Sequence, residues 1–203
     1  MFYEPDKRDH GLPRDPFKSL VVPRPIGWIS TLDAEGRPNL APYSFFNAVA
    51  SDPPVVVFGT SLRPDGSRKD SQRNIEATGE FVLNLAIHEL RAEMNTTSAT
   101  LSPGESEFAA AGLDTLPARL VRPPRVRASP VHFECVWLQT VALPCNTPGQ
   151  GNFAVFGRVV GVHVDDALIA DGLVDIARAR PIARLGYMDY TSVDRVFSMD
   201  RPG

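Results

Sequence analysis

The chain has 203 residues, of which 43% are hydrophobic and 22% are charged, so it is long enough for one large domain with its own core. With 21 Lys and Arg against 24 Asp and Glu, the formal net charge of -3 argues against a generic nucleic-acid-binding protein, and the hydrophobic content excludes a disordered polyelectrolyte. The N-terminus lacks the apolar stretch of a signal peptide and no apolar run approaches about 20 residues, so we expect a cytoplasmic protein that does not enter a membrane.

Turn-forming residues are frequent and cysteines are scarce. The 19 prolines and 15 glycines favour many short strands and turns over a helix bundle. Two cysteines, Cys135 and Cys145, make at most one disulfide, and we expect free thiols. We therefore expect one mainly β domain over residues 1–203, with peripheral helices and with residues 1–22 as a polar N-terminal arm.

The N-terminal half contains three strand candidates. Residues 26–32 and 38–49 flank a turn that ends at Gly36, and this arrangement predicts a β-hairpin. Residues 55–58 form a continuous apolar run, which is typical of a strand buried on both faces.

A polar helix is predicted next, over residues 67–78. Ser67 or Asp70 would cap its start, and Gly79 would end it. In residues 80–87, apolar and mixed positions alternate, which predicts a strand with one strongly apolar face.

The C-terminal half continues with helices and then strands. Residues 90–111 are rich in Ala and Glu and predict one or two short helices, broken at Pro103-Gly104. Alternation predicts a strand over residues 131–143, and a more buried strand follows over residues 153–164. Residues 195–199 could form a last short strand.

Familiar catalytic and metal-binding motifs are absent from the sequence. There is no Gly-x-Ser-x-Gly elbow and no Walker loop, and residues 149–151 lack the third glycine of a dinucleotide fingerprint. His132 and Cys135 lie three residues apart on a predicted strand, so they point to opposite faces and do not suit a shared metal ion. We expect neither a metal site nor a catalytic triad.

Small polar side chains instead gather at the ends of predicted strands, before the polar helix. These are Ser30, Thr31, Ser44, Asn47, Thr60 and Ser61. Lys69, Asp70 and Ser71 open the helix, whose N-terminus offers unpaired N–H groups and a positive dipole end. The residues therefore suit a phosphate site, although an ordinary capped surface helix with solvated charges explains them somewhat better from the residues alone.

Three stretches of the chain together resemble one family. They are PRPIGWISTLDAEGRPNLAPYSFFNAVASDPPVVVFGT, the following RKDSQRNI, and the C-terminal GRVVGVHVDD with IARARPIARLGYMDY. Over residues 23–199 the sequence resembles the flavin reductase-like family of FMN-binding split barrels. The resemblance implies a Greek-key split β-barrel with peripheral helices, and a homodimer that binds FMN near the subunit interface.

The resemblance also implies which residues hold the flavin. The ring would lie along two segments, Ser30-Thr31 and Ser44-Phe45-Phe46-Asn47, and the phosphate would be held around Thr60, Ser61, Lys69, Asp70 and Ser71. Ser71 stands where relatives commonly have Thr, which keeps the hydroxyl. Tyr187 stands where they often have a second Gly, which bears on access to the flavin.

The implied activity is that of an FMN-dependent oxidoreductase. It would take hydride from NADH or NADPH and pass electrons to free flavin, a partner monooxygenase or another acceptor. Because flavin accepts hydride at its own N5, we expect no indispensable catalytic side chain. Two alternatives stay open: a different acceptor, such as a metal complex or a small quinone, and an FMN-binding electron-transfer protein without efficient nicotinamide turnover.

One basic run is left unassigned. Arg119, Arg122, Arg125 and Arg127 have no acidic residue between them. They could receive anionic nicotinamide or flavin phosphates, or they could be a solvated connector that Pro123-Pro124 stiffens, which we favour.

Overall fold

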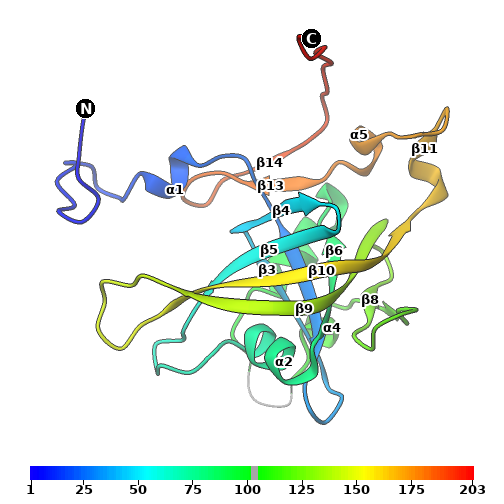
Figure 1. Cartoon of the computed structure of the whole chain (residues 1–203), viewed down its shortest axis with the longest axis horizontal. Helices are drawn as coiled ribbons and strands as arrows, with labels where there is room; N and C mark the ends of the chain where they lie inside the picture. Colours follow the sequence, from blue (N-terminus) through cyan, green and yellow to red (C-terminus); the bar gives the residue numbers. More distant parts are fainter. Residues whose placement is uncertain (102–104) are drawn as a thin grey trace.

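Seven antiparallel strands form one strongly curled sheet in the computed structural model, which describes residues 1–101 and 105–203 (Figure 1). Their order across the sheet is β3-β2-β6-β9-β10-β5-β4. The bounds are β2 (Gly27–Leu32), β3 (Pro38–Tyr43), β4 (Phe46–Ser51), β5 (Pro54–Ser61), β6 (Glu80–Leu85), β9 (Val131–Leu143) and β10 (Asn152–Val164).

Smaller elements surround this sheet. A three-stranded sheet pairs β1 (Arg24–Pro25), β13 (Ile182–Arg184) and β14 (Tyr190–Ser192), and two ribbons pair β7 (Thr115–Leu116) with β8 (Arg125–Val126) and β11 (Ile169–Ala170) with β12 (Leu173–Val174). The helices are α1 (Phe17–Leu20), α2 (Asp70–Thr78), α3 (Arg91–Thr96), α4 (Glu107–Ala110) and α5 (Ile176–Ala179), with 3-10 turns η1 (His88–Leu90) and η2 (Asp166–Leu168). In the described part of the chain, every helix is too short or too polar to span a bilayer.

The core has two main apolar clusters, on opposite faces of β2. Ile29 joins Phe58 and Phe81 in one cluster. Trp28 lies in the other, with Met94 of α3. Because consecutive strand residues point to opposite faces, β2 is buried on both sides and fixes the register of the sheet.

The predicted mainly β class with peripheral helices is confirmed, as are the hairpin of β2 with β3 and the strands β9 and β10. The sheet stays open between β3 and β4, and a Greek-key connection stays a prediction. The expected helix break at Pro103-Gly104 lies outside the described residues.

The single returning strand predicted over residues 38–49 is wrong. The chain divides into β3 and β4, which lie at opposite edges of the sheet. The crossing is held where the N–H of Gly59 donates to the Phe45 carbonyl at 2.6 Å. The Phe46 ring packs so closely on Gly27 that a Cβ there would stand 2.8 Å from it. Because the sheet is curled, the continuous segment of residues 38–51 can form both edge strands, β3 and β4.

Other boundaries also differ from the predictions. Helix α2 begins at Asp70 after an N-cap at Lys69, so neither Ser67 nor Asp70 is the cap, whereas Gly79 ends the helix with a positive φ of 77° as expected. β5 alternates between buried and half-buried side chains. β6 is buried on both faces, because Phe81 and Leu83 point into the core and β8 packs against Asn84 on the other face. Residues 195–199 form no strand; the last strand is β14, which pairs with β13.

Candidate functional site

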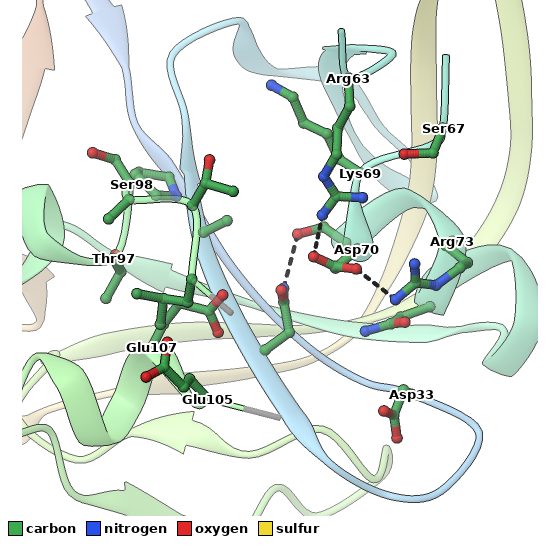
Figure 2. A pocket seen from close by; sticks show the side chains of 18 of the residues that line it. Asp33, Arg63, Ser67, Lys69, Asp70, Arg73, Thr97, Ser98, Glu105 and Glu107 are labelled. Atoms are coloured by element: carbon green, nitrogen blue, oxygen red, sulfur yellow. Dashed lines mark hydrogen bonds and ion pairs between the residues drawn. The ribbon is translucent and has the colours of Figure 1, made fainter. Parts of the chain in front are cut away.

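A pocket of about 850 Å³ opens between the edge strand β3 and the start of α2. One wall carries Arg63, Lys69, Asp70 and Arg73, and the facing wall carries Thr97, Ser98, Glu105 and Glu107 (Figure 2). Its size lies within the range of roughly 300–1,000 Å³ that is typical of small-molecule sites. It is therefore large enough for a nucleotide-sized ligand.

Buried hydrogen bonds hold α2 against the sheet at this pocket. Thr31 of β2 accepts bonds from Asn74 at 3.1 Å and Asn39 at 3.4 Å, and Asn39 also donates to the Ser71 hydroxyl at 3.0 Å. These four side chains are almost fully buried and come from β2, β3 and α2. The network fixes where the first turn of α2 meets the pocket, because buried polar groups lose free energy if their bonds are broken.

Lys69 is the cation at the start of α2. Its ammonium lies 5.8 Å from the centroid of the Tyr43 ring. Burial lowers the pKa of Lys69, and the charges of Arg63 and Lys18 lower it further. Among the described residues, no carboxylate forms an ion pair with Lys69. It is thus a half-buried positive charge that the chain leaves without a counter-ion.

Asp70 is committed to arginines. Its carboxylate pairs with Arg63 on one side and with Arg73 at 2.5 Å on the other. No side chain caps the N-terminus of α2, whose first turn lines the pocket. The uncapped turn and Lys69 together make a cradle for an anion, since the N–H groups and helix dipole both favour negative charge. We call Lys69, Ser71 and this first turn the anion cradle.

Tyr43 ends β3 beside the anion cradle. Burial raises the pKa of Tyr43, and the neighbouring hydroxyl groups of Ser71 and Thr60 partly offset that effect. Its ring packs against Phe58, with the centroids 4.7 Å apart. The phenol is therefore a neutral polar group at the base of the pocket.

The facing wall has the opposite electrostatic character. Glu107 accepts the backbone N–H of Leu40 at 3.2 Å, which satisfies a donor on the edge strand β3. Burial raises the pKa of Glu107, the charge of Asp70 raises it further, and Arg63 opposes this. The pocket is thus cationic on the α2 side and acidic on the other.

The structure brings part of the predicted site together. Four of the predicted phosphate residues line the pocket: Ser61, Lys69, Asp70 and Ser71. Thr60 lies beneath them beside the Tyr43 hydroxyl. The predicted ring segment, Ser44, Phe45, Phe46 and Asn47, continues the chain directly after Tyr43, and Phe45 is 46% exposed.

Ser30 and Thr31 do not reach the pocket. Both are fully buried, and the Ser30 hydroxyl donates to the Pro124 carbonyl at 2.5 Å. Thr31 supports α2 through the network described above. Thr31 therefore helps to position the anion cradle, whereas Ser30 ties β2 to the Pro124 backbone. Direct contact with a flavin stays a prediction for both.

The basic run is largely tied to its surroundings. Arg122 pairs with Glu80 at 2.9 Å, Arg125 donates to the Pro117 carbonyl at 3.1 Å, and Arg127 donates to the Thr115 carbonyl at 3.3 Å. These bonds fit a connector that is fastened to the sheet.

Tyr187 has a backbone conformation that glycine adopts more easily. Its φ is 52°, and its exposed ring lies 5.7 Å from the Arg14 guanidinium. Glycine adopts this left-handed region without the steric cost that a side chain brings.

Sequence reasoning missed Arg63, Asn39 and Glu107. Arg63 follows the predicted strand end at Thr60-Ser61, so its place beside the phosphate residues could have been inferred. Asn39 and Glu107 are adjacent to the site through tertiary packing, for which the sequence carries no local signal.

Comparisons with known proteins identify the family to which the chain belongs. The sequence model of the flavin reductase like domain matches residues 19–183. An uncharacterized protein of Aquifex aeolicus is 38% identical over 168 residues, 82% of this chain and 83% of the relative. Nitrilotriacetate monooxygenase component B from Bacillus cereus superposes with a TM-score of 0.89 at 29% identity, covering 98% of both chains.

A structure from Shewanella frigidimarina, assigned as a flavin reductase with a split barrel domain, superposes with a TM-score of 0.79 at 27% identity, over 92% of this chain and 90% of that one. The matched residues include β2 to β6, α2 and the pocket between them. The chain belongs to the flavin reductase-like family, whose members bind flavin.

Proposed function

We propose that the pocket binds FMN with its phosphate in the anion cradle. The observation that carries this is the half-buried charge of Lys69, which lacks a carboxylate partner among the described residues and stands at an uncapped helix N-terminus. A phosphate would supply the missing counter-ion of Lys69 and accept hydrogen bonds from the N–H groups in the first turn of α2. Ser61 and Ser71 add hydroxyl groups on the same wall.

The flavin ring would then follow the segment Ser44-Phe45-Phe46-Asn47. This segment leaves the pocket directly after Tyr43, and the Phe45 side chain is open to contact. When bound, FMN supplies a ring that accepts hydride at N5. The side chains described above would bind and orient the FMN. His163 is the histidine that could act as a general acid, but its Nε2 lies 2.5 Å from Glu134 and it lies outside the pocket lining.

The proposed reaction is hydride transfer from NADH or NADPH to FMN, with electrons passing on to free flavin or a partner monooxygenase. The likeness to a monooxygenase component B over the whole chain supports a partner monooxygenase. The alternative, an FMN-binding electron-transfer protein without efficient nicotinamide turnover, shares the same pocket and differs in catalysis alone.

Two measurements test this function. The purified protein is titrated with FMN and with riboflavin while the flavin absorbance spectrum is recorded, and we expect tighter binding of FMN. NADH or NADPH is then added with excess free FMN, and sustained loss of the nicotinamide absorbance is expected. FMN binding without turnover would select the electron-transfer alternative, and no flavin binding would refute the assignment.

We also propose a homodimer. The arm before Pro23 exposes apolar side chains, including Phe17 and Leu20, and the C-terminal tail exposes Phe197. Both segments project from the same side of the molecule (Figure 1). Exposed apolar segments of this kind are costly unless a partner covers them. Sedimentation with FMN present is expected to show twice the chain mass, and a 22 kDa species at micromolar concentration would contradict the proposal.

A further inference from the structure

Two cations flank the Phe45 ring outside the pocket lining. The Arg24 guanidinium lies 5.7 Å from the ring centroid, and the Lys18 ammonium lies 5.9 Å from it. Arg24 belongs to β1 and Lys18 to α1, so the N-terminal arm contributes to the surroundings of the proposed ring segment.

Arg24 is a buried charge without a counter-ion in the described part of the chain. Its side chain is 7% exposed, and its guanidinium donates to three backbone carbonyls, those of Lys18, Val21 and Leu185. Its Nε has no hydrogen-bond partner among the described residues. Burial lowers the pKa of Arg24, and the charge of Arg184 lowers it further. Such a charge is costly to bury and gains free energy when an anion comes near.

Lys18 extends this positive region toward the anion cradle. It forms no ion pair with any described carboxylate, and it is close enough to Lys69 for its charge to lower the pKa of Lys69. Positive charge therefore runs without interruption from Lys69 beside Tyr43 to Lys18 and Arg24 beside Phe45. One phosphate in the cradle would neutralise its Lys69 end and leave the Phe45 end uncompensated.

We infer that Lys18 and Arg24 stabilise the negative charge that a flavin ring on Phe45 acquires when it is reduced. This inference rests on the proposed function. Hydride transfer moves two electrons and one hydrogen from NADH to the ring, so NAD⁺ leaves and the ring retains one additional negative charge, located around N1 and the C2 carbonyl. Preformed positive charges at that place favour the reduced form without needing a proton from the protein.

Lys18→Gln is the test variant, because Arg24 also ties the arm to the rest of the fold. The dissociation constants of oxidised FMN and of dithionite-reduced FMN are measured anaerobically, together with the midpoint potential of the bound flavin. We expect reduced FMN to bind about three- to fivefold more weakly and the midpoint potential to become more negative. Oxidised FMN should change by less than about twofold, and Lys18→Arg should restore the wild-type values.

Lys7→Gln is the matched control. Lys7 lies on the same arm and pairs with Glu4 at 2.7 Å, so its loss should leave both constants and the potential unchanged. Equal weakening of both flavin forms by Lys18→Gln would place Lys18 on the phosphate and overturn the inference. A higher KM for NADH with both flavin constants unchanged would assign it to the coenzyme and also overturn it. Failure of the wild-type protein to bind FMN would instead refute the proposed function.

Discussion

Two regions of the molecule arrange backbone N–H groups and a basic side chain in a way that suits an anion. In one of them the anion is a carboxylate of the chain itself. Glu134 of β9 is fully buried and accepts the backbone N–H groups of Arg119, Leu120 and Val121 at 2.8, 2.6 and 3.2 Å. His163 of β10 approaches the same carboxylate at 2.5 Å. Backbone N–H groups and a basic side chain thus surround an internal carboxylate.

The anion cradle has the same chemistry without such a carboxylate. Its N–H groups lie at the first turn of α2, its basic group is Lys69, and the nearest acid, Asp70, is bound to Arg63 and Arg73. The Glu134 carboxylate holds the loop of residues 119–121 in place, whereas the anion cradle is available to an anion from solution. The comparison therefore separates a structural anion site from the proposed ligand site by one feature, namely whether a carboxylate of the chain occupies it.

The largest expected effect comes from removing the Glu134 carboxylate from its site. Glu134→Ala removes a fully buried carboxylate that accepts three backbone N–H groups, and we expect the free energy of unfolding to fall by about 3–5 kcal/mol. Urea denaturation measures it. Glu89→Ala is the control, because Glu89 is an exposed partner of Arg180 and its loss should change stability little. A small effect of Glu134→Ala would show that water replaces the carboxylate easily.

The next effect concerns the open site. Lys69→Ala is expected to weaken FMN binding about ten- to a hundredfold, since a charge-assisted contact contributes roughly 1.5–3 kcal/mol. Riboflavin, which has no phosphate, should bind unchanged. Arg68→Ala is the matched control: Arg68 precedes Lys69 in the chain but pairs with Glu76 at 2.5 Å outside the pocket lining. Equal losses for FMN and riboflavin would move the phosphate elsewhere.

A smaller effect is expected from His163→Ala. Because its Nε2 is turned toward Glu134, the variant should slow reduction of bound FMN by NADH less than about tenfold, well below the 10²–10⁴ that general acid–base catalysis contributes. Stopped-flow bleaching of bound FMN measures the rate. A hundredfold loss in folded, FMN-loaded protein would make His163 a direct participant in proton transfer.

The smallest effect is a pH dependence of the filled site. Burial alone raises the pKa of Glu134, but hydrogen bonds from His163 and from the N–H groups of Arg119 and Leu120 bring it below its ordinary value of 4.5. A lowered pKa means that Glu134 contributes its full stability above about pH 4.5 and loses it as the pH falls through the folded value. Unfolding of Glu134→Gln should therefore depend less on pH below 4.5, and parallel curves would contradict this.

Local patterns predicted the parts of the fold that local physics controls. Strand β9 has the predicted bounds, because alternation marks a strand with one buried face. The division of residues 38–49 into β3 and β4 could not be predicted, since apolar spacing does not record which sheet edge a strand joins. Residues 195–199 have strand-like composition but no neighbouring strand to pair with in the described structure.

The same distinction holds for the site. Lys69 and Ser71, which line the pocket, were predicted as phosphate residues because a helix start is recognisable in sequence and N–H groups there attract anions. Thr31 was assigned to the ligand, yet it hydrogen-bonds Asn39 and Asn74, which lie 8 and 43 residues away. Its role depends on which elements pack together, and a single sequence holds no signal for that.

The crossing between β3 and β4 has a mechanical consequence. The two edges of the sheet are joined at Ser44-Phe45, where the Gly59 N–H bonds to the Phe45 carbonyl. A ligand that extends from Lys69 to Phe45 would contact the chain where the two edge strands β3 and β4 meet, and would therefore hold these strands together. Because a ligand that binds the folded state suppresses opening, amide hydrogen exchange in β3 and β4 should slow together when FMN is added.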